Sequence, residues 1–196
     1  STEAQLREVD IGSWFDAGFS DQRVPLLSEV LELCKDRIGV NIELKYYGGE
    51  RRLEQSVIDR VEEAGMEEQI VVMSLHHDGV RKMRRLRPHW KVGLLSTVSI
   101  GNLAALDVDF LALNGRAATR SLIGRAHQHG QDVMVWTIND ALGINSMISR
   151  GVDAIITDEP ALAMEILRQR QQLEPLEQLF IKLADLFDKP SLYRDQ

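Results

Sequence analysis

Two charged side chains lie near the end of a short apolar stretch of the chain. The stretch runs from Val40 to Lys45, alternates apolar with polar residues, and is flanked by glycines. This pattern predicts a short buried β-strand. Glu43 and Lys45 are two residues apart, so both side chains lie on the same face of that strand. Burial of a carboxylate costs free energy unless a cation or hydrogen-bond donors meet it, so we expect these two residues to form a charge pair.

Two interpretations of this pair remain open. It can be a surface salt bridge on a half-exposed strand. It can also belong to an active site, because α/β enzymes place their chemistry at the carboxyl ends of parallel strands.

Trp136 ends another predicted strand and is followed by polar residues. An indole in this place would form a wall of a pocket at the mouth of a barrel. Asn139 or Asp140 would line the same mouth, or would cap the next helix. Asp158 precedes Pro160 in a typical helix start, so we expect it to have a structural role.

His76 and His77 follow a strand that ends at Ser74. Histidines at that rim could act as acid, base or metal ligand, or could be polar rim residues without chemistry. We expect no catalytic role for the other three histidines, which lie in a turn and near a helix end (His89, His127 and His129).

Strand-like and helix-like segments alternate about six times along the chain. The predicted strands are apolar runs at residues 40–45, 69–74, 91–95, 108–114, 132–137 and 153–157. The predicted helices span residues 2–8, 25–37, 50–64, 77–86, 100–106, 119–129, 140–149 and 161–172. Continuous apolar strands are typical of a parallel sheet that is covered on both faces.

An open doubly wound sheet and a (β/α)8 TIM barrel both fit this alternation. No GxGxxG or Walker-type loop follows any strand, which favours the barrel. A complete barrel takes ~250 residues, so we predict an incomplete barrel with about six of its eight strand–helix units. Residues 171–187 predict one more amphipathic helix, which divides the chain into a partial barrel (1–170) and a C-terminal helix and tail (171–196).

Composition excludes several classes of protein. The formal net charge of -7 argues against a nucleic-acid partner, and the basic run at residues 81–87 fits a solvated helix face. No apolar run approaches the ~20 residues that span a bilayer. The sequence leaves open whether the parent protein is cytoplasmic or membrane-attached.

Five segments together resemble the glycerophosphodiester phosphodiesterase family. They are residues 9–15 (VDIGSWF), 25–31 (PLLSEVL), 41–45 (NIELK), 135–140 (VWTIND) and 151–160 (GVDAIITDEP). The resemblance implies a (β/α)8 barrel and a phosphodiesterase that releases glycerol 3-phosphate and an alcohol. It also implies that Glu43 binds a divalent metal, Ca²⁺ or Mg²⁺, that Lys45 meets the substrate phosphate, and that Trp136 walls the glycerol pocket.

The sequence departs from the family pattern at its start. Family members open with a His-Arg-Gly type motif, a Glu-x-Asp pair and a His-Asp pair, which supply the acid–base histidines and two metal carboxylates. None of these motifs is found in the sequence, which begins just downstream of where they would lie. The pair at His77 and Asp78 follows a later strand, so we do not assign the catalytic role to it. The chain alone is therefore expected to be inactive, and a degenerate barrel that serves as a binding or assembly module is the alternative.

An incomplete barrel has two open strand edges. We expect a second copy of the chain or an upstream segment to cover them. Trp14 and Phe15 lie in a predicted loop, where aromatic side chains commonly plug an edge or shape a pocket.

Overall fold

The computed structural model describes residues 2–48, 52–97 and 103–173. The chain divides into two compact units, the first formed by residues 1–42 and 46–71 and the second by residues 43–45 and 72–196. Each unit is described by itself below.

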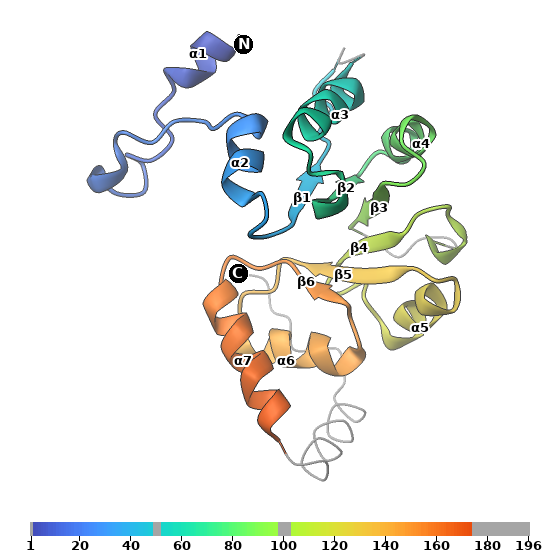
Figure 1. Cartoon of the computed structure of the whole chain (residues 1–196). Coiled ribbons are helices and arrows are strands. Elements are labelled where there is room, and N and C mark those ends of the chain that lie inside the picture. The colour runs from blue at the N-terminus through green and yellow to red at the C-terminus, as the bar shows by residue number, and fades with distance from the viewer. Residues whose placement is uncertain (1, 49–51, 98–102, 174–196) are drawn as a thin grey trace. The chain divides into compact units, whose positions relative to one another are not determined.

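Strands and helices alternate along the chain as the sequence predicts (Figure 1). The strands are β1 (Val40–Glu43), β2 (Ile70–Ser74), β3 (Lys91–Ser96), β4 (Phe110–Asn114), β5 (Asp132–Trp136) and β6 (Ala154–Ile155). The α-helices are α1 (Glu3–Arg7), α2 (Leu27–Cys34), α3 (Leu53–Ala64), α4 (His77–Leu86), α5 (Arg120–Gln128), α6 (Ala141–Arg150) and α7 (Pro160–Gln172). Short 3-10 helices are η1 (Ala17–Phe19), η2 (Glu67–Gln69) and η3 (Leu103–Ala105).

The six strands follow one another in the sheet in their order along the chain, from β1 to β6. The pairs β3–β4, β4–β5 and β5–β6 are parallel. Parallel neighbours that are consecutive in sequence require a crossover between them, which α5 provides between β4 and β5 and α6 between β5 and β6. This arrangement confirms the predicted α/β class and the six predicted strands.

Strand β4 of the second unit is buried on both faces. On β4, Leu111 and Leu113 are fully buried on one face, and Phe110 and Ala112 are almost fully buried on the other. Such two-sided burial explains why the strand is apolar throughout rather than alternating. Helix α5 packs on β5, and α6 packs against α7.

β6 is shorter than predicted, although backbone hydrogen bonds to β5 continue on both sides of it: the Asp153 N–H donates to the Val133 carbonyl at 2.8 Å and the Ile156 N–H to the Val135 carbonyl at 2.7 Å. Before the strand, the Asp153 carboxylate accepts a hydrogen bond from the backbone N–H of Val133 at 2.7 Å. After it, the Thr157 hydroxyl donates to Asn139 at 3.0 Å. These side-chain hydrogen bonds add to the backbone bonds at the two ends of the strand, whose regular part is Ala154 and Ile155.

Local sequence signals determine where α2 begins and where α3 ends. α2 begins at Leu27 and not at Pro25, because the Glu29 carboxylate accepts the backbone N–H of Leu26 at 2.7 Å and makes Leu26 the N-cap. α3 ends before Gly65, whose φ of 62° lies in the left-handed region that favours glycine.

The loop aromatics of the first unit do not plug an edge or line a pocket within that unit. Trp14 and Phe15 are 82% and 71% exposed, and Phe15 lies 5.7 Å from the ring of Phe19. The loop is held by its own polar groups: the indole N–H of Trp14 donates to the Ile11 carbonyl at 2.8 Å. Local hydrogen bonds therefore fix the loop without burying its aromatic rings.

The predicted helix at residues 171–187 falls mostly outside the described residues, and the domain boundary at residue 170 stays a prediction. Of the predicted helix at 100–106, the structure describes the turn η3. Among the residues that the structure describes, no helix has the length and apolar character needed to cross a bilayer.

Candidate functional site

The predicted charge pair is present at the carboxyl end of β1. Lys45 Nζ lies 3.5 Å from Glu43 Oε2, and the two side chains are 57% and 24% exposed. Leu44 lies between them and is almost fully buried, so it points to the opposite face. Its backbone N–H donates to the Met73 carbonyl at 2.8 Å. The neighbouring strand thus fixes the backbone that carries both charges.

The polar residues at the end of β2 have structural partners. Ser74 is fully buried, and its hydroxyl donates to the Leu44 carbonyl at 2.8 Å while it accepts the His76 N–H at 3.1 Å. His76 is the N-cap of α4 and His77 is the first residue of that helix. Ser74 therefore joins the ends of β1 and β2 and is not open to a ligand.

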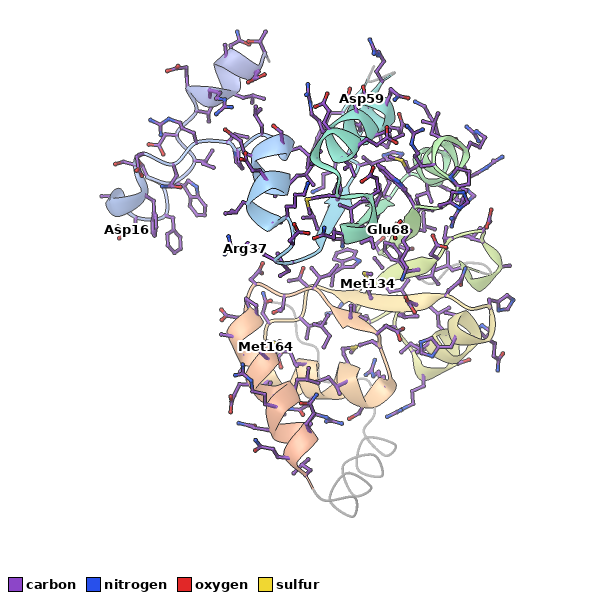
Figure 2. The ribbon with its side chains drawn as sticks, viewed as in Figure 1. Asp16, Arg37, Asp59, Glu68, Met134 and Met164 are labelled. Atoms are coloured by element: carbon purple, nitrogen blue, oxygen red, sulfur yellow. The ribbon has the colours of Figure 1, made fainter. Side chains whose placement is uncertain are left out.

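Trp136 ends β5 directly opposite Asn114, which ends β4. The indole N–H donates to the Ala112 carbonyl at 3.1 Å, and the side chain is partly buried. Side chains alternate between the faces of a strand, so Trp136 shares its face with Met134, which is labelled in Figure 2. The ring is therefore fixed to the neighbouring strand but retains a solvent-facing part.

The choice between Asn139 and Asp140 as helix cap is decided in favour of Asp140. Its carboxylate accepts the Gly143 N–H at 2.8 Å at the start of α6. Asn139 instead joins the loop after β5 to the loop after β6. Its amide donates to Asp158 Oδ2 at 2.8 Å, and its Oδ1 accepts the Thr157 hydroxyl at 3.0 Å and the Asp158 N–H at 2.9 Å. We call these three residues the Asn139 clasp.

Asp158 has a structural role as a member of the clasp and does not cap α7. The N-cap of α7 is Glu159, which makes no side-chain cap hydrogen bond, and Pro160 occupies the first turn as expected. The sequence could not reveal the clasp, because Asn139 and its partners are 18 and 19 residues apart.

The described residues do not fit a complete metal site. No group of three or more His, Cys, Asp or Glu side chains in this part of the chain could hold a metal ion. Ca²⁺ and Mg²⁺ take six or more oxygen ligands, with several from carboxylates or waters. Glu43 supplies one carboxylate, and the Lys45 ammonium beside it competes for that charge.

Comparisons with known proteins identify the family. Residues 1–162 match the Glycerophosphoryl diester phosphodiesterase family. The chain is 29% identical over 182 residues to a glycerophosphodiester phosphodiesterase of Caldanaerobacter subterraneus subsp. tengcongensis, covering 86% of this chain and 72% of the relative. It is 28% identical over 178 residues to one of Bacillus altitudinis, covering 84% of this chain and 71% of the relative.

Solved structures show the same fold. One is a protein of Silicibacter pomeroyi that is named as a glycerophosphoryl diester phosphodiesterase by inference. It has a TM-score of 0.77 and 26% identity, and the match covers 87% of this chain and 68% of that one. A phosphodiesterase of Oleispira antarctica in complex with the product sn-glycerol-3-phosphate has a TM-score of 0.73 and 21% identity, covering 86% of this chain and 71% of that one. The chain belongs to the glycerophosphoryl diester phosphodiesterase family.

Proposed function

We propose that the chain is the phosphate- and glycerol-binding portion of a phosphodiesterase that hydrolyses glycerophosphodiesters to glycerol 3-phosphate and an alcohol. The observation that carries this proposal is the Glu43–Lys45 pair at the carboxyl end of β1. A strand-borne ammonium that is more than half exposed can turn from its carboxylate to a phosphate. The product bound to the related Oleispira phosphodiesterase supports the same ligand class.

Each proposed residue has a separate task. Lys45 binds the phosphate as a compact positive charge. Trp136 packs its ring against the glycerol carbons, because the indole is fixed by Ala112 and offers an apolar face. The family resemblance implies that Glu43 is a ligand of a divalent cation, Ca²⁺ or Mg²⁺. When bound, this cation would stabilise the negative charge of the phosphoryl group. The described residues do not complete such a site.

We further propose that the chain alone does not hydrolyse the diester. Hydrolysis requires a positioned base for the attacking oxygen and an acid for the leaving group. In the structure, His76 and His77 belong to the start of α4, and His127 pairs with Asp153 at 2.8 Å. We assign neither the base nor the acid to any of these three, and we therefore expect the chain to bind substrate without turnover.

The test separates binding from turnover. We expect purified chain to show no hydrolysis of glycerophosphocholine with added Ca²⁺ or Mg²⁺, yet to bind sn-glycerol 3-phosphate in a calorimetric titration. Lys45→Gln should weaken that binding by about tenfold or more, since it removes a charge-assisted contact. Lys91→Gln is the matched control, because Lys91 is exposed at the opposite, amino-terminal end of β3.

Two outcomes contradict the proposal. Hydrolysis that is lost in Glu43→Gln would show that the chain is a competent enzyme. Equal binding of glycerol 3-phosphate by Lys45→Gln, Lys91→Gln and the unmodified chain would show that the strand-end pair is not a phosphate site.

The alternative is a degenerate barrel that acts as a binding or assembly module. It is favoured by the lack of a metal-binding group of side chains in the described part of the chain. A module of this kind would not use Lys45 to bind a phosphate. The alternative would therefore be supported if the unmodified chain did not bind glycerol 3-phosphate.

A further inference from the structure

The side-chain amide of Asn114 lies at the end of β4 and has no role in the proposed function. Asn114 is the last residue of β4 and lies directly opposite Trp136 in the parallel register. Ala112 lies two residues earlier on the same face of β4 and accepts the indole N–H at 3.1 Å. The Asn114 side chain and the Trp136 ring are therefore neighbours on one face, at the end of the sheet where ligands bind in parallel α/β folds.

The turn that follows β4 fixes which way the Asn114 amide is oriented. Its Oδ1 accepts the backbone N–H of Arg116 at 3.0 Å. Its backbone carbonyl accepts the N–H of Ala117 at 2.8 Å. Gly115 lies so close to Ile138 that a Cβ on it would be 2.7 Å from the Ile138 side chain. An asparagine held in this way, by its oxygen, presents its NH₂ group outward from the turn.

That NH₂ group has no acceptor within the described ranges. Every hydrogen bond of the Asn114 side chain that the structure shows is made by Oδ1, and the residue is partly buried. The NH₂ group is therefore free to donate to water or to a ligand. The group is also uncharged, so it matches a hydroxyl oxygen better than a phosphate, for which the ammonium of Lys45 is the stronger partner.

We propose that Asn114 is a substrate-binding residue that donates from Nδ2 to a hydroxyl oxygen of the glycerol moiety, beside the ring of Trp136. This inference rests on the proposed function, because it assigns a further contact in the same site. It would make the site select ligands with a free glycerol hydroxyl over phosphate alone. A site built to hydrogen-bond a hydroxyl rejects ligands that lack it.

The test follows the Asn114 side-chain amide and the Trp136 indole N–H by ¹H–¹⁵N NMR of the full chain. The titrants are sn-glycerol 3-phosphate, glycerol and inorganic phosphate. We expect glycerol 3-phosphate to shift both signals, glycerol to shift both at higher concentration, and phosphate to shift neither.

Variants separate ligand contact from a role in the turn. Asn114→Asp keeps the oxygen that accepts the Arg116 N–H but removes the donor, so a merely structural role predicts unchanged glycerol binding. We expect glycerol affinity to fall by at least about threefold and glycerol 3-phosphate affinity by at least about tenfold, because added charge also repels the phosphate. Asn145→Asp on α6 is the control for the same substitution elsewhere in the unit.

The outcomes distinguish this inference from the proposed function. If glycerol 3-phosphate shifts Trp136 but not the Asn114 amide, or if Asn114→Asp binds glycerol as the unmodified chain does, the Asn114 assignment is wrong and the proposed function stands. If glycerol 3-phosphate shifts neither signal and does not bind, the proposed function itself fails. If inorganic phosphate alone shifts the Asn114 amide, the assignment to a glycerol hydroxyl is wrong.

Discussion

Gly93 on β3 lies against the ring of Phe110 on β4. A Cβ on Gly93 would be 2.2 Å from Phe110 Cε2, and the ring is 1% exposed and cannot move away freely. Gly93→Ala should therefore lower the free energy of unfolding by about 1–3 kcal/mol, as overpacking of a core does. Urea denaturation followed by circular dichroism measures this change.

Gly124→Ala is the matched control. Gly124 lies in the interior of α5, and a Cβ there would meet no atom within 4 Å. Alanine in an exposed helix position is favoured over glycine by about 1 kcal/mol, so this variant should be more stable than the unmodified chain. Destabilisation of the same size in both variants would show that the Gly93–Phe110 contact is not the cause.

The Asp10 carboxyl makes the stability of the first unit depend on pH. Its carboxylate accepts hydrogen bonds from the Ser13 hydroxyl, the Ser13 N–H and the Gly12 N–H. These bonds favour the charged form and lower the pKa of Asp10 from 3.8 to about 2. Because the pKa is lower in the folded than in the unfolded chain, the stabilisation is present above about pH 4 and is lost as the pH falls towards 2.

The prediction for Asp10 is checked by ¹³C NMR titration of its side-chain carboxyl. Ser13→Ala removes the largest of the three contributions and should raise the pKa of Asp10 towards 3.8. Ser20→Ala, in the same loop region, is the control and should leave it unchanged. A pKa of Asp10 near 4 in the unmodified chain would contradict the hydrogen-bonded loop.

The Asn139 clasp acts at the scale of elements, since it joins the loop between β5 and α6 to the loop between β6 and α7. Asn139→Ala removes all three of its hydrogen bonds. The groups are exposed, so water replaces part of the loss, and we expect about 1 kcal/mol lower stability. The backbone N–H of Asp158 should also exchange its hydrogen faster, because Asn139 Oδ1 is its acceptor.

Thr137→Ala is the control for the clasp. The Thr137 side chain is exposed two residues from Asn139, and no hydrogen bond of it is seen in the described structure. Unchanged exchange at Asp158 in Asn139→Ala would contradict the clasp, and equal acceleration in Thr137→Ala would show a general loosening of the loop.

The elements that the sequence predicts well are those with local signals. The span of α4 is predicted from its apolar spacing and from Pro88, and Thr119 is the N-cap of α5 through its hydroxyl. The Glu43–Lys45 pair follows from strand alternation alone. The clasp depends on partners 18 and 19 residues away in sequence, and no local pattern encodes such contacts.

At the scale of the whole molecule, the strand order predicts where another polypeptide can pair. β1 and β6 are the two ends of the order, and an edge strand offers unpaired N–H and C=O groups. The periodicity of the sequence predicts the number of strand–helix units, because each unit repeats the same apolar pattern. That pattern does not encode which polypeptide pairs with the two edge strands. We propose that a second copy of this chain pairs with them.

We therefore expect the molar mass from light scattering to rise with protein concentration towards that of a dimer. Ala154→Lys places a charge on the β6 edge, which native edge strands use against pairing, and should shift the chain towards monomer. Ser121→Lys adds the same charge on the exposed surface of α5 and should not. A monomer at every concentration would contradict the proposal. A dimer that persists in Ala154→Lys would exclude the β6 edge and direct attention to another surface, such as the exposed rings of Trp14 and Phe15.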